Sequence, residues 1–209
     1  LEGYYQETGR AGRDGDPADA WMAYGLGDMV TLKQMIANSD AGEDRQRLER
    51  RKLDTLLAYC ESTRCRRQTL LANFGEVYAD ACNNCDNCLD PPQAWDATVA
   101  AQKALSCVYR TGQRFGVVHL VDVLRGVDNE RMTQFGHDQL STFGVGADID
   151  ARQWKGVFRQ LVAMGLLEVD TEGYGALRLA DASRPVLRGE QPVMMRREAE
   201  KRRAKKTTR

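Results

Sequence analysis

The sequence lacks long apolar runs and an excess of either charge, and each absence excludes a class of protein. No run of about 18 apolar residues is present, which excludes an ordinary membrane-spanning helix. The first residues show no basic segment followed by an apolar one, as a secretory signal requires. With 42% hydrophobic and 29% charged residues among 209, we expect a soluble, cytoplasmic protein of one or two domains.

The charges cancel over the whole chain but not along it. Thirty Lys and Arg residues balance 30 Asp and Glu residues, which excludes a uniformly basic nucleic-acid coat. Residues 196–209 hold eight basic residues against two glutamates, a net charge of +6, which leaves −6 for residues 1–195. This stretch also has too little apolar content to fold alone. We therefore assign residues 191–209 to a basic linker or tail.

Apolar periodicity predicts a helical platform in the first half of the chain. Segment 44–60 places Leu48, Leu53 and Leu57 on one stripe and turns its basic residues to solvent. The pair Pro91-Pro92 ends the platform, because proline cannot continue a helix, and marks a linker. The expected platform helices cover residues 44–60 and 64–73, and a short amphipathic helix over residues 28–37 precedes them.

The second half of the chain has the element order of a winged helix. Three helices are followed by two short strands, and such a hairpin forms the wing. A glycine-rich stretch through Gly146 is expected to be irregular. The fold class is thus mainly α with a small β-hairpin. The expected helices cover residues 97–110, 117–125 and 151–164, and the expected strands 166–169 and 176–179.

Four of the six cysteines have the spacing of a zinc site, C-x16-C-x2-C-x2-C. Tetrahedral zinc needs four soft ligands around one point, and a two-residue gap lets neighbouring thiolates turn inward. Three of these cysteines lie within seven polar residues that form no apolar stripe, so buried or disulfide-bonded cysteines are the weaker alternative. The predicted ligands are Cys65, at the start of a helix, and Cys82, Cys85 and Cys88.

The remaining cysteines and the two histidines are expected to be structural. Cys60 and Cys107 lie on apolar helix stripes, which favours packed side chains over ligands. His119 and His137 have no ligand-like neighbour four residues away. We therefore predict no second metal site from these four residues.

A glycine- and arginine-rich motif, QETGRAGRDG, occupies residues 6–15. Arg10 and Arg13 are three residues apart, a spacing that places them one turn apart on the same side. Gly9 and Gly12 remove side-chain bulk, so a polyphosphate can approach, and the arginines suit the charge-stabilising role of an arginine finger. A solvated surface loop is the alternative explanation of the same pattern.

Together these features resemble the RecQ family of ATP-dependent DNA helicases. YYQETGRAGRDG is similar to helicase motif VI in its RecQ form, and the cysteine quartet is similar to the family's zinc-binding subdomain. Three further segments resemble the winged helix of that family: QRFGVVHLVDVLRG, GHDQLSTFGVG and PVLRGE. The likeness covers residues 3–190 in family order, and the short wing and cysteine loop look bacterial.

The resemblance implies four segments. They are the C-terminal remnant of an α/β RecA-like lobe at 1–37, a zinc-binding helical subdomain at 38–92, a winged-helix domain at 93–190 and the basic tail at 191–209.

The resemblance also implies roles for particular residues. Arg10 and Arg13 would be catalytic, reaching the γ-phosphate of ATP, and Gln6 would assist in ATP binding. Arg125 and Lys155 would contact duplex phosphates, and Tyr174 at the wing tip would stack on a terminal base pair. For the arginines of the platform, Arg64, Arg66 and Arg67, phosphate contacts and solvated helix charges remain equal alternatives.

The implied cofactors are structural zinc and, in a complete enzyme, ATP and Mg²⁺. The sequence holds no G-x-x-x-x-G-K-[ST] phosphate loop, so we expect no ATP hydrolysis by this chain alone. The implied partners are duplex DNA with a single-stranded overhang, the remaining helicase domains and a single-stranded DNA-binding protein. The implied setting is DNA repair and recombination at the nucleoid.

A non-enzymatic, zinc-containing winged-helix regulator is the rival hypothesis. It accounts for the cysteine quartet and the wing, but not for GRAGRDG near the first residue. A phosphate-loop motif encoded upstream of Leu1 would favour the helicase, and an initiator Met there would favour the regulator.

Overall fold

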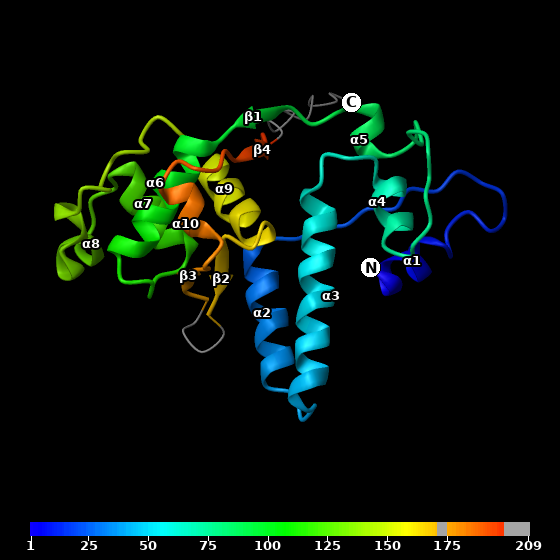
Figure 1. Ribbon diagram of the computed structural model, residues 1–209, viewed down its shortest axis with the longest axis horizontal. Coiled ribbons are helices and arrows are strands. Elements are labelled where there is room, and N and C mark those ends of the chain that lie inside the picture. The colour runs from blue at the N-terminus through cyan, green and yellow to red at the C-terminus, as the bar shows by residue number, and fades with distance from the viewer. Residues whose placement is uncertain (171–174, 199–209) are drawn as a thin grey trace, which may run out of the picture.

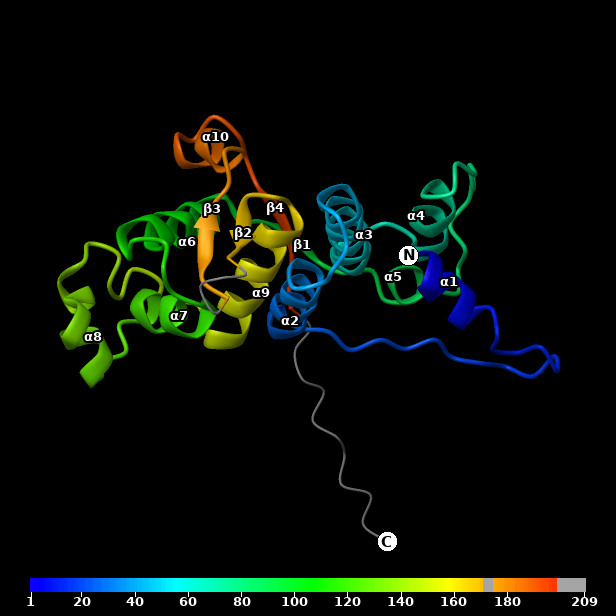
Figure 2. The ribbon, with the colours of Figure 1, turned by 90° about the horizontal axis from the view of Figure 1, so that it is seen from below.

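The described chain, residues 1–170 and 175–198 of a computed structural model, has two lobes flanking an antiparallel helical hairpin (Figure 1). The hairpin consists of α2 (Leu26–Ala37) and α3 (Glu43–Glu61). A winged-helix lobe lies on one side of it, and α1 (Glu2–Thr8), α4 (Arg66–Ala72) and α5 (Asp86–Leu89) lie on the other, as Figure 2 also shows. None of the described helices combines the length and apolar character needed to cross a membrane.

The platform helices form where the apolar periodicity predicts them, within a few residues. The Asp28 carboxylate accepts a hydrogen bond from the Gly25 N–H at 2.7 Å and so caps the start of α2. Leu53 and Leu57 on α3 are buried, as predicted, but Leu48 is 46% exposed. Leu48 lies one to two turns before the part of α3 that packs against the rest of the molecule, so the buried stripe is shorter than the sequence pattern.

The winged helix is confirmed. Its helices are α6 (Thr98–Arg110), α7 (Val117–Arg125) and α9 (Ala151–Ala163). Antiparallel strands β2 (Leu167–Val169) and β3 (Leu177–Leu179) follow, with Glu168 opposite Arg178. The core of this lobe is assembled from side chains that are 0% exposed, among them Leu105, Leu120, Leu124, Trp154, Phe158 and Leu161.

The glycine-rich stretch after α7 is more regular than expected. It contains α8 (Glu130–Phe135) and a single turn of 3-10 helix, η1 (His137–Gln139). The Asn129 side chain caps α8 by accepting from the Met132 N–H at 3.1 Å, and the Met132 side chain is fully buried. A six-residue helix is too short to show a helical period, so the prediction of an irregular segment was wrong here.

Glycine is required where α7 ends. Gly126 has φ +67°, a left-handed conformation that disfavours side chains, and a Cβ there would lie 3.1 Å from the Cα of Gly144. This close approach lets the segment after α8 return across the end of α7 and places Arg125 on the last turn of a rigid helix.

A second small sheet closes the winged-helix lobe. Strand β1 (Ala94–Asp96) pairs antiparallel with β4 (Met194–Arg196), and α10 (Ser183–Leu187) precedes β4. The buried Gln160 side chain donates to the Arg196 carbonyl at 3.0 Å and accepts from its N–H at 2.9 Å, as a neighbouring strand would. The sequence analysis predicted none of these elements and assigned 191–209 to the tail. The segment 194–196 therefore folds against residues a hundred positions earlier.

Both histidines are structural, as expected. Nε2 of His119 and Nδ1 of His137 lie 2.7 Å apart, and the Phe115 ring stacks on His119 with centroids 4.2 Å apart. Burial, and then the charges of His137 and Arg131, lower the pKa of His119 to about 4. Both rings are thus neutral at pH 7, and one donates to the other.

The histidine pair predicts a pH dependence of stability. In the unfolded chain the pKa of His119 returns to about 6.5, so the free energy of unfolding should fall as pH drops from about 6.5 to about 4. The lowered folded-state pKa makes this loss on the order of 2–3 kcal/mol. His119→Gln cannot take up the proton and should remove most of this dependence. Urea unfolding across this pH range checks it, and parallel profiles for the two proteins would contradict it.

Candidate functional site

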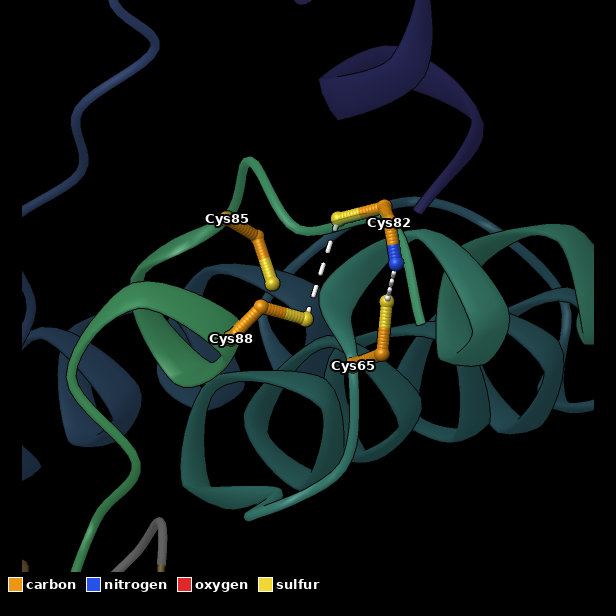
Figure 3. A group of neighbouring side chains, drawn as sticks. All are labelled: Cys65, Cys82, Cys85 and Cys88. Atoms are coloured by element: carbon orange, nitrogen blue, oxygen red, sulfur yellow. Dashed lines mark hydrogen bonds between the residues drawn. The ribbon is translucent and has the colours of Figure 1, made fainter. Parts of the chain in front are cut away.

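The four predicted zinc ligands meet at one point. Their sulfur atoms lie within 4.8 Å of one another, and Cys82 Sγ and Cys88 Sγ are 3.9 Å apart. Figure 3 shows all four side chains directed at a common centre. A tetrahedron with Zn–S bonds of about 2.3 Å has S···S edges of about 3.8 Å, so the donor set and its spacing fit zinc. The four-cysteine cluster is a structural zinc site.

The backbone positions these sulfurs. Cys65 is the N-cap residue of α4, where the unpaired N–H groups of a helix start favour a thiolate. The Cys82 N–H donates to Cys65 Sγ and the Arg66 N–H donates to Cys85 Sγ, both at 3.4 Å. Asn83 has φ +51°, a left-handed turn conformation that asparagine tolerates. The left-handed turn and the two N–H···S contacts thus hold the loop around the sulfur atoms.

Protonation of the cysteines reflects the same geometry. Burial raises the pKa of Cys65, but hydrogen bonds from the backbone of Gln68 and Cys82 outweigh it and lower that pKa to about 6. Cys88, whose thiol is hydrogen-bonded to Cys85, has its pKa raised to about 12. The thiols thus share protons, and a divalent cation at their centre would replace those protons as the common partner.

Cys60 and Cys107 take no part in this cluster. Both are buried, and burial raises the pKa of Cys60 to about 11 and that of Cys107 to about 12. Unlike Cys88, whose pKa is similarly high, neither of them belongs to a group of three or more potential metal ligands within the described residues. Their assignment as packed apolar side chains is confirmed.

Arg66 and Asn87 tie the zinc loop to the end of α3. Arg66 binds the Asp86 carboxylate with two nitrogens at 3.0 Å, and it also donates to the carbonyls of Tyr59 and, at 3.1 Å, Cys60. Asn87 donates to the carbonyls of Ser62 and Arg64 at 2.8 and 2.7 Å. With its side chain only 14% exposed and its donors occupied, Arg66 is a structural residue rather than a phosphate contact.

The arginine motif lies on the surface at the end of α1. This helix ends at Thr8, and Gly12 has φ +69°, so residues 9–14 form turns and not the helical turn that the spacing suggests. Arg10 forms an exposed ion pair with Glu7 at 3.4 Å, and Arg13 Nε donates to the Gly9 carbonyl at 3.4 Å. Gln6 is exposed on α1. All three side chains are accessible to a ligand.

The predicted DNA contacts occupy two helices that pack against each other. Arg125 is exposed at the end of α7, and Lys155 is exposed on α9. Within residues 1–170 and 175–198, neither forms an ion pair. Tyr174 lies outside the described residues. Arg152, which the sequence analysis did not single out, is exposed three positions before Lys155 and therefore on the same face of α9. The three-residue spacing from Lys155 is the sequence signal that could have identified Arg152.

The structure is thus a helical platform with a four-cysteine zinc site, followed by a winged helix, and comparison with known proteins identifies the family. A model described as "RecQ zinc-binding" matches residues 26–89, and one described as "RQC domain" matches residues 91–204. The chain therefore belongs to the RecQ helicase family.

Relatives include the ATP-dependent DNA helicases RecQ of three bacteria. The chain is 42% identical to that of Pasteurella multocida over 93% of its own length and 31% of the relative. It is 41% identical to that of Haemophilus influenzae over 92% of its length and 31% of the relative. It is 33% identical to that of Bacillus subtilis over 92% of its length and 32% of the relative. The chain thus spans about a third of the length of these relatives.

We predict one zinc ion per chain, bound through all four thiolates. Because zinc sites of this kind supply about 10 kcal/mol or more of folding free energy, Cys85→Ser should abolish zinc binding and unfold the platform. Cys107→Ser, the matched buried control, should keep zinc and lose only about 1–3 kcal/mol of stability. Elemental analysis with circular dichroism measures both, and equal zinc content in Cys85→Ser and wild type would refute the ligand assignment.

Proposed function

We propose that this chain is the part of an ATP-dependent DNA helicase that holds duplex DNA at a fixed position relative to the motor. The observation that carries the proposal is the order of three elements: an arginine motif, a zinc platform and a winged helix joined through one helical hairpin. The names of the relatives support the reaction, which is unwinding of DNA coupled to ATP hydrolysis.

In this proposal the winged helix binds DNA through a few local phosphate contacts. Residues 96–190 hold eleven basic and twelve acidic residues, so no overall charge attracts DNA to this lobe. The exposed guanidinium of Arg125 and ammonium of Lys155, without carboxylate partners in the described chain, are free to replace counterions on phosphates. Arg152 would add a third such contact. Tyr174 would stack on a terminal base pair.

Arg10 and Arg13 act in the motor in this proposal. Their exposed cations would stabilise the charge that develops on the transferred phosphoryl group, with Gln6 as a hydrogen-bonding neighbour. ATP and Mg²⁺ would be bound mainly by the remaining helicase domains, and these domains and a single-stranded DNA-binding protein are the proposed protein partners. DNA repair and recombination are the proposed setting.

Arginine removal tests the motor role. In the intact helicase that contains this chain, Arg10→Ala or Arg13→Ala should cut DNA-stimulated ATP turnover on the order of a thousandfold, because the charge is needed in the transition state. Nucleotide binding should change little. Arg45→Ala, an exposed arginine in the same chain, is the matched control. A near-normal turnover rate for Arg13→Ala would exclude the role.

Salt dependence tests the DNA contacts. Each phosphate contact releases counterions, so the double variant Arg125→Ala, Lys155→Ala should lower the slope of log affinity against log salt by about two units. Arg152→Ala should lower it by about one further unit. Tyr174→Ala should leave the slope unchanged and cost at most about 1–3 kcal/mol. Fluorescence anisotropy on duplex with a single-stranded overhang measures all of these.

The same titration separates the proposal from the regulator hypothesis. Binding should tolerate changes of duplex sequence, since phosphate contacts carry no sequence information. If the double variant binds with unchanged affinity and slope, the winged helix is a spacer or a protein-docking surface instead.

A further inference from the structure

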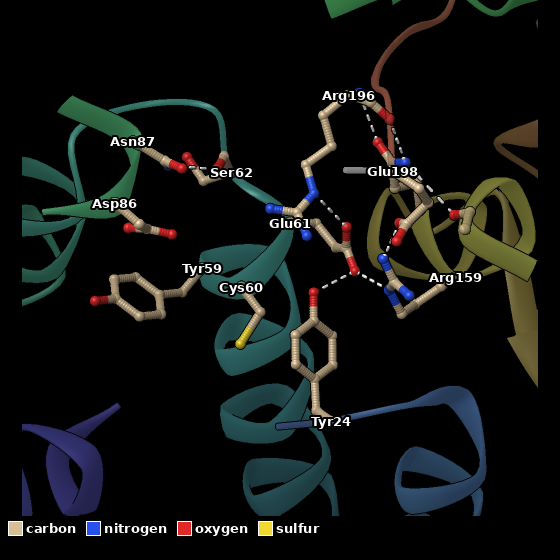
Figure 4. Close-up of polar contacts among 12 residues, drawn as sticks. Tyr24, Tyr59, Cys60, Glu61, Ser62, Asp86, Asn87, Arg159, Arg196 and Glu198 are labelled. Atoms are coloured by element: carbon tan, nitrogen blue, oxygen red, sulfur yellow. Dashed lines mark hydrogen bonds and ion pairs between the residues drawn. The ribbon is translucent and has the colours of Figure 1, made fainter. Parts of the chain in front are cut away.

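A buried carboxylate joins the helical hairpin to the winged-helix lobe. Glu61 is the last residue of α3, and its side chain is 6% exposed. Its Oε1 accepts hydrogen bonds from the Tyr24 hydroxyl at 2.5 Å and from Arg159 Nε on α9 (Figure 4). One oxygen atom therefore binds both the segment that enters α2 and the third helix of the winged helix.

The second oxygen of Glu61 faces the returning C-terminal strand. Arg196 Nε on β4 lies 3.2 Å from Glu61 Oε2, an ion pair held by charge without the alignment of a hydrogen bond. Arg159 in turn donates through Nη2 to Glu198 Oε1, so its guanidinium bridges two carboxylates. The network alternates in charge and links residues 24, 61, 159 and 196–198.

Local packing is adapted to this network. The Arg159 guanidinium lies 5.2 Å from the centroid of the Tyr24 ring, and burial together with the Glu61 charge raises the pKa of the Tyr24 hydroxyl. A Cβ on Gly156 would lie 2.6 Å from Glu198 Cγ, so glycine allows Glu198 to approach α9. The Glu198 N–H donates to Gln153 Oε1 at 3.2 Å, which holds the carboxylate over the helix.

Because this network is buried, the loss of one of its charges costs more stability than the loss of an exposed ion pair. The side chains of Arg159, Glu198 and Arg196 are 15, 15 and 20% exposed, whereas both partners of the Arg10–Glu7 pair are about two-thirds exposed. Exposed pairs contribute little, but removal of one member of a buried pair leaves an uncompensated charge. The zinc loop is bonded to the residues on either side of Glu61, because Arg66 donates to the Cys60 carbonyl at 3.1 Å and Asn87 donates to the Ser62 carbonyl at 2.8 Å.

We propose that Glu61 is a positioning residue that locks the winged helix to the zinc platform and to the segment carrying Arg10 and Arg13. The inference rests on the proposed function and deepens it. When the segment that carries Arg10 and Arg13 is displaced, Tyr24 transmits the displacement to Glu61 and Arg159. Helix α9, with its exposed Arg152 and Lys155, then moves together with that segment. Arg159 serves the lock and makes no DNA contact.

The first test uses this chain loaded with zinc. Glu61→Gln keeps the shape of the side chain but removes its charge, and it should increase the maximum dimension in small-angle X-ray scattering. Hydrogen exchange of residues 194–198 should become at least about tenfold faster, since the strand loses a charged partner. Glu49→Gln, which breaks exposed ion pairs on the same helix, is the matched control and should match wild type in both measurements.

A gentler variant guards against simple misfolding. Arg159→Lys keeps the positive charge beside Glu61, but one ammonium cannot bridge two carboxylates. It should bind one zinc per chain and show an intermediate change in shape and exchange. Unchanged scattering and exchange for both Glu61→Gln and Arg159→Lys would overturn the inference.

The second test uses the intact helicase that contains this chain. Glu61→Gln should leave ATP turnover on single-stranded DNA within about twofold of wild type, but lower the base pairs separated per ATP by at least about fivefold, a coupling loss of ordinary size. A merely destabilised protein would lose ATP turnover and unwinding in proportion, so the number of base pairs separated per ATP would stay at the wild-type value. That result would overturn the inference. If the wild-type protein unwinds no duplex, the proposed function fails. The scattering comparison of Glu61→Gln with wild type then decides alone whether Glu61 positions the winged helix.

Discussion

The convergence of four thiolates on one point is the constraint on which the arrangement of the chain depends. Helices α1 and α4 contain no buried residue, and α5 contains one, so this end of the molecule cannot hold its shape by apolar burial. A bound metal supplies the missing free energy. The donors of Arg66 and Asn87 then carry the position of the zinc loop to the last turn of α3. The zinc site therefore acts through the end of α3.

The placement of the winged helix follows from that helix end. In many winged-helix proteins the third helix is the DNA reader, but here α9 packs against α3 and its Arg159 is bound to Glu61. What remains accessible on α9 is its first part, where Arg152 and Lys155 are exposed. The packing thus divides one helix into a segment that can face DNA and a segment that faces the platform.

Sequence reasoning succeeded where the signal is local and failed where it is distant. Three zinc ligands lie within seven residues, and α7 begins and ends at the predicted residues, because spacing and periodicity are properties of short segments. Strands β1 and β4 are three residues long and come from opposite ends of the lobe, so neither shows a pattern alone. Glu61 was missed for the same reason: its partners Tyr24 and Arg159 are 37 and 98 residues away. Nothing near residue 61 distinguishes it from a solvated glutamate at a helix end.

A charged junction between the hairpin and the winged-helix lobe has a physical advantage that an apolar one lacks. Burial of apolar surface is non-directional, so a purely apolar contact of α9 on α3 would tolerate sliding and rotation. The guanidinium of Arg159 presents its donors in a rigid fork, and two carboxylates satisfy it in one relative orientation. Apolar side chains in place of such a network can preserve the stability of the fold but no longer select one relative orientation of the two helices. In the proposed function the winged-helix lobe holds DNA at a set angle, which requires a fixed orientation more than added stability, and the buried charges are the part of this interface that supplies that orientation.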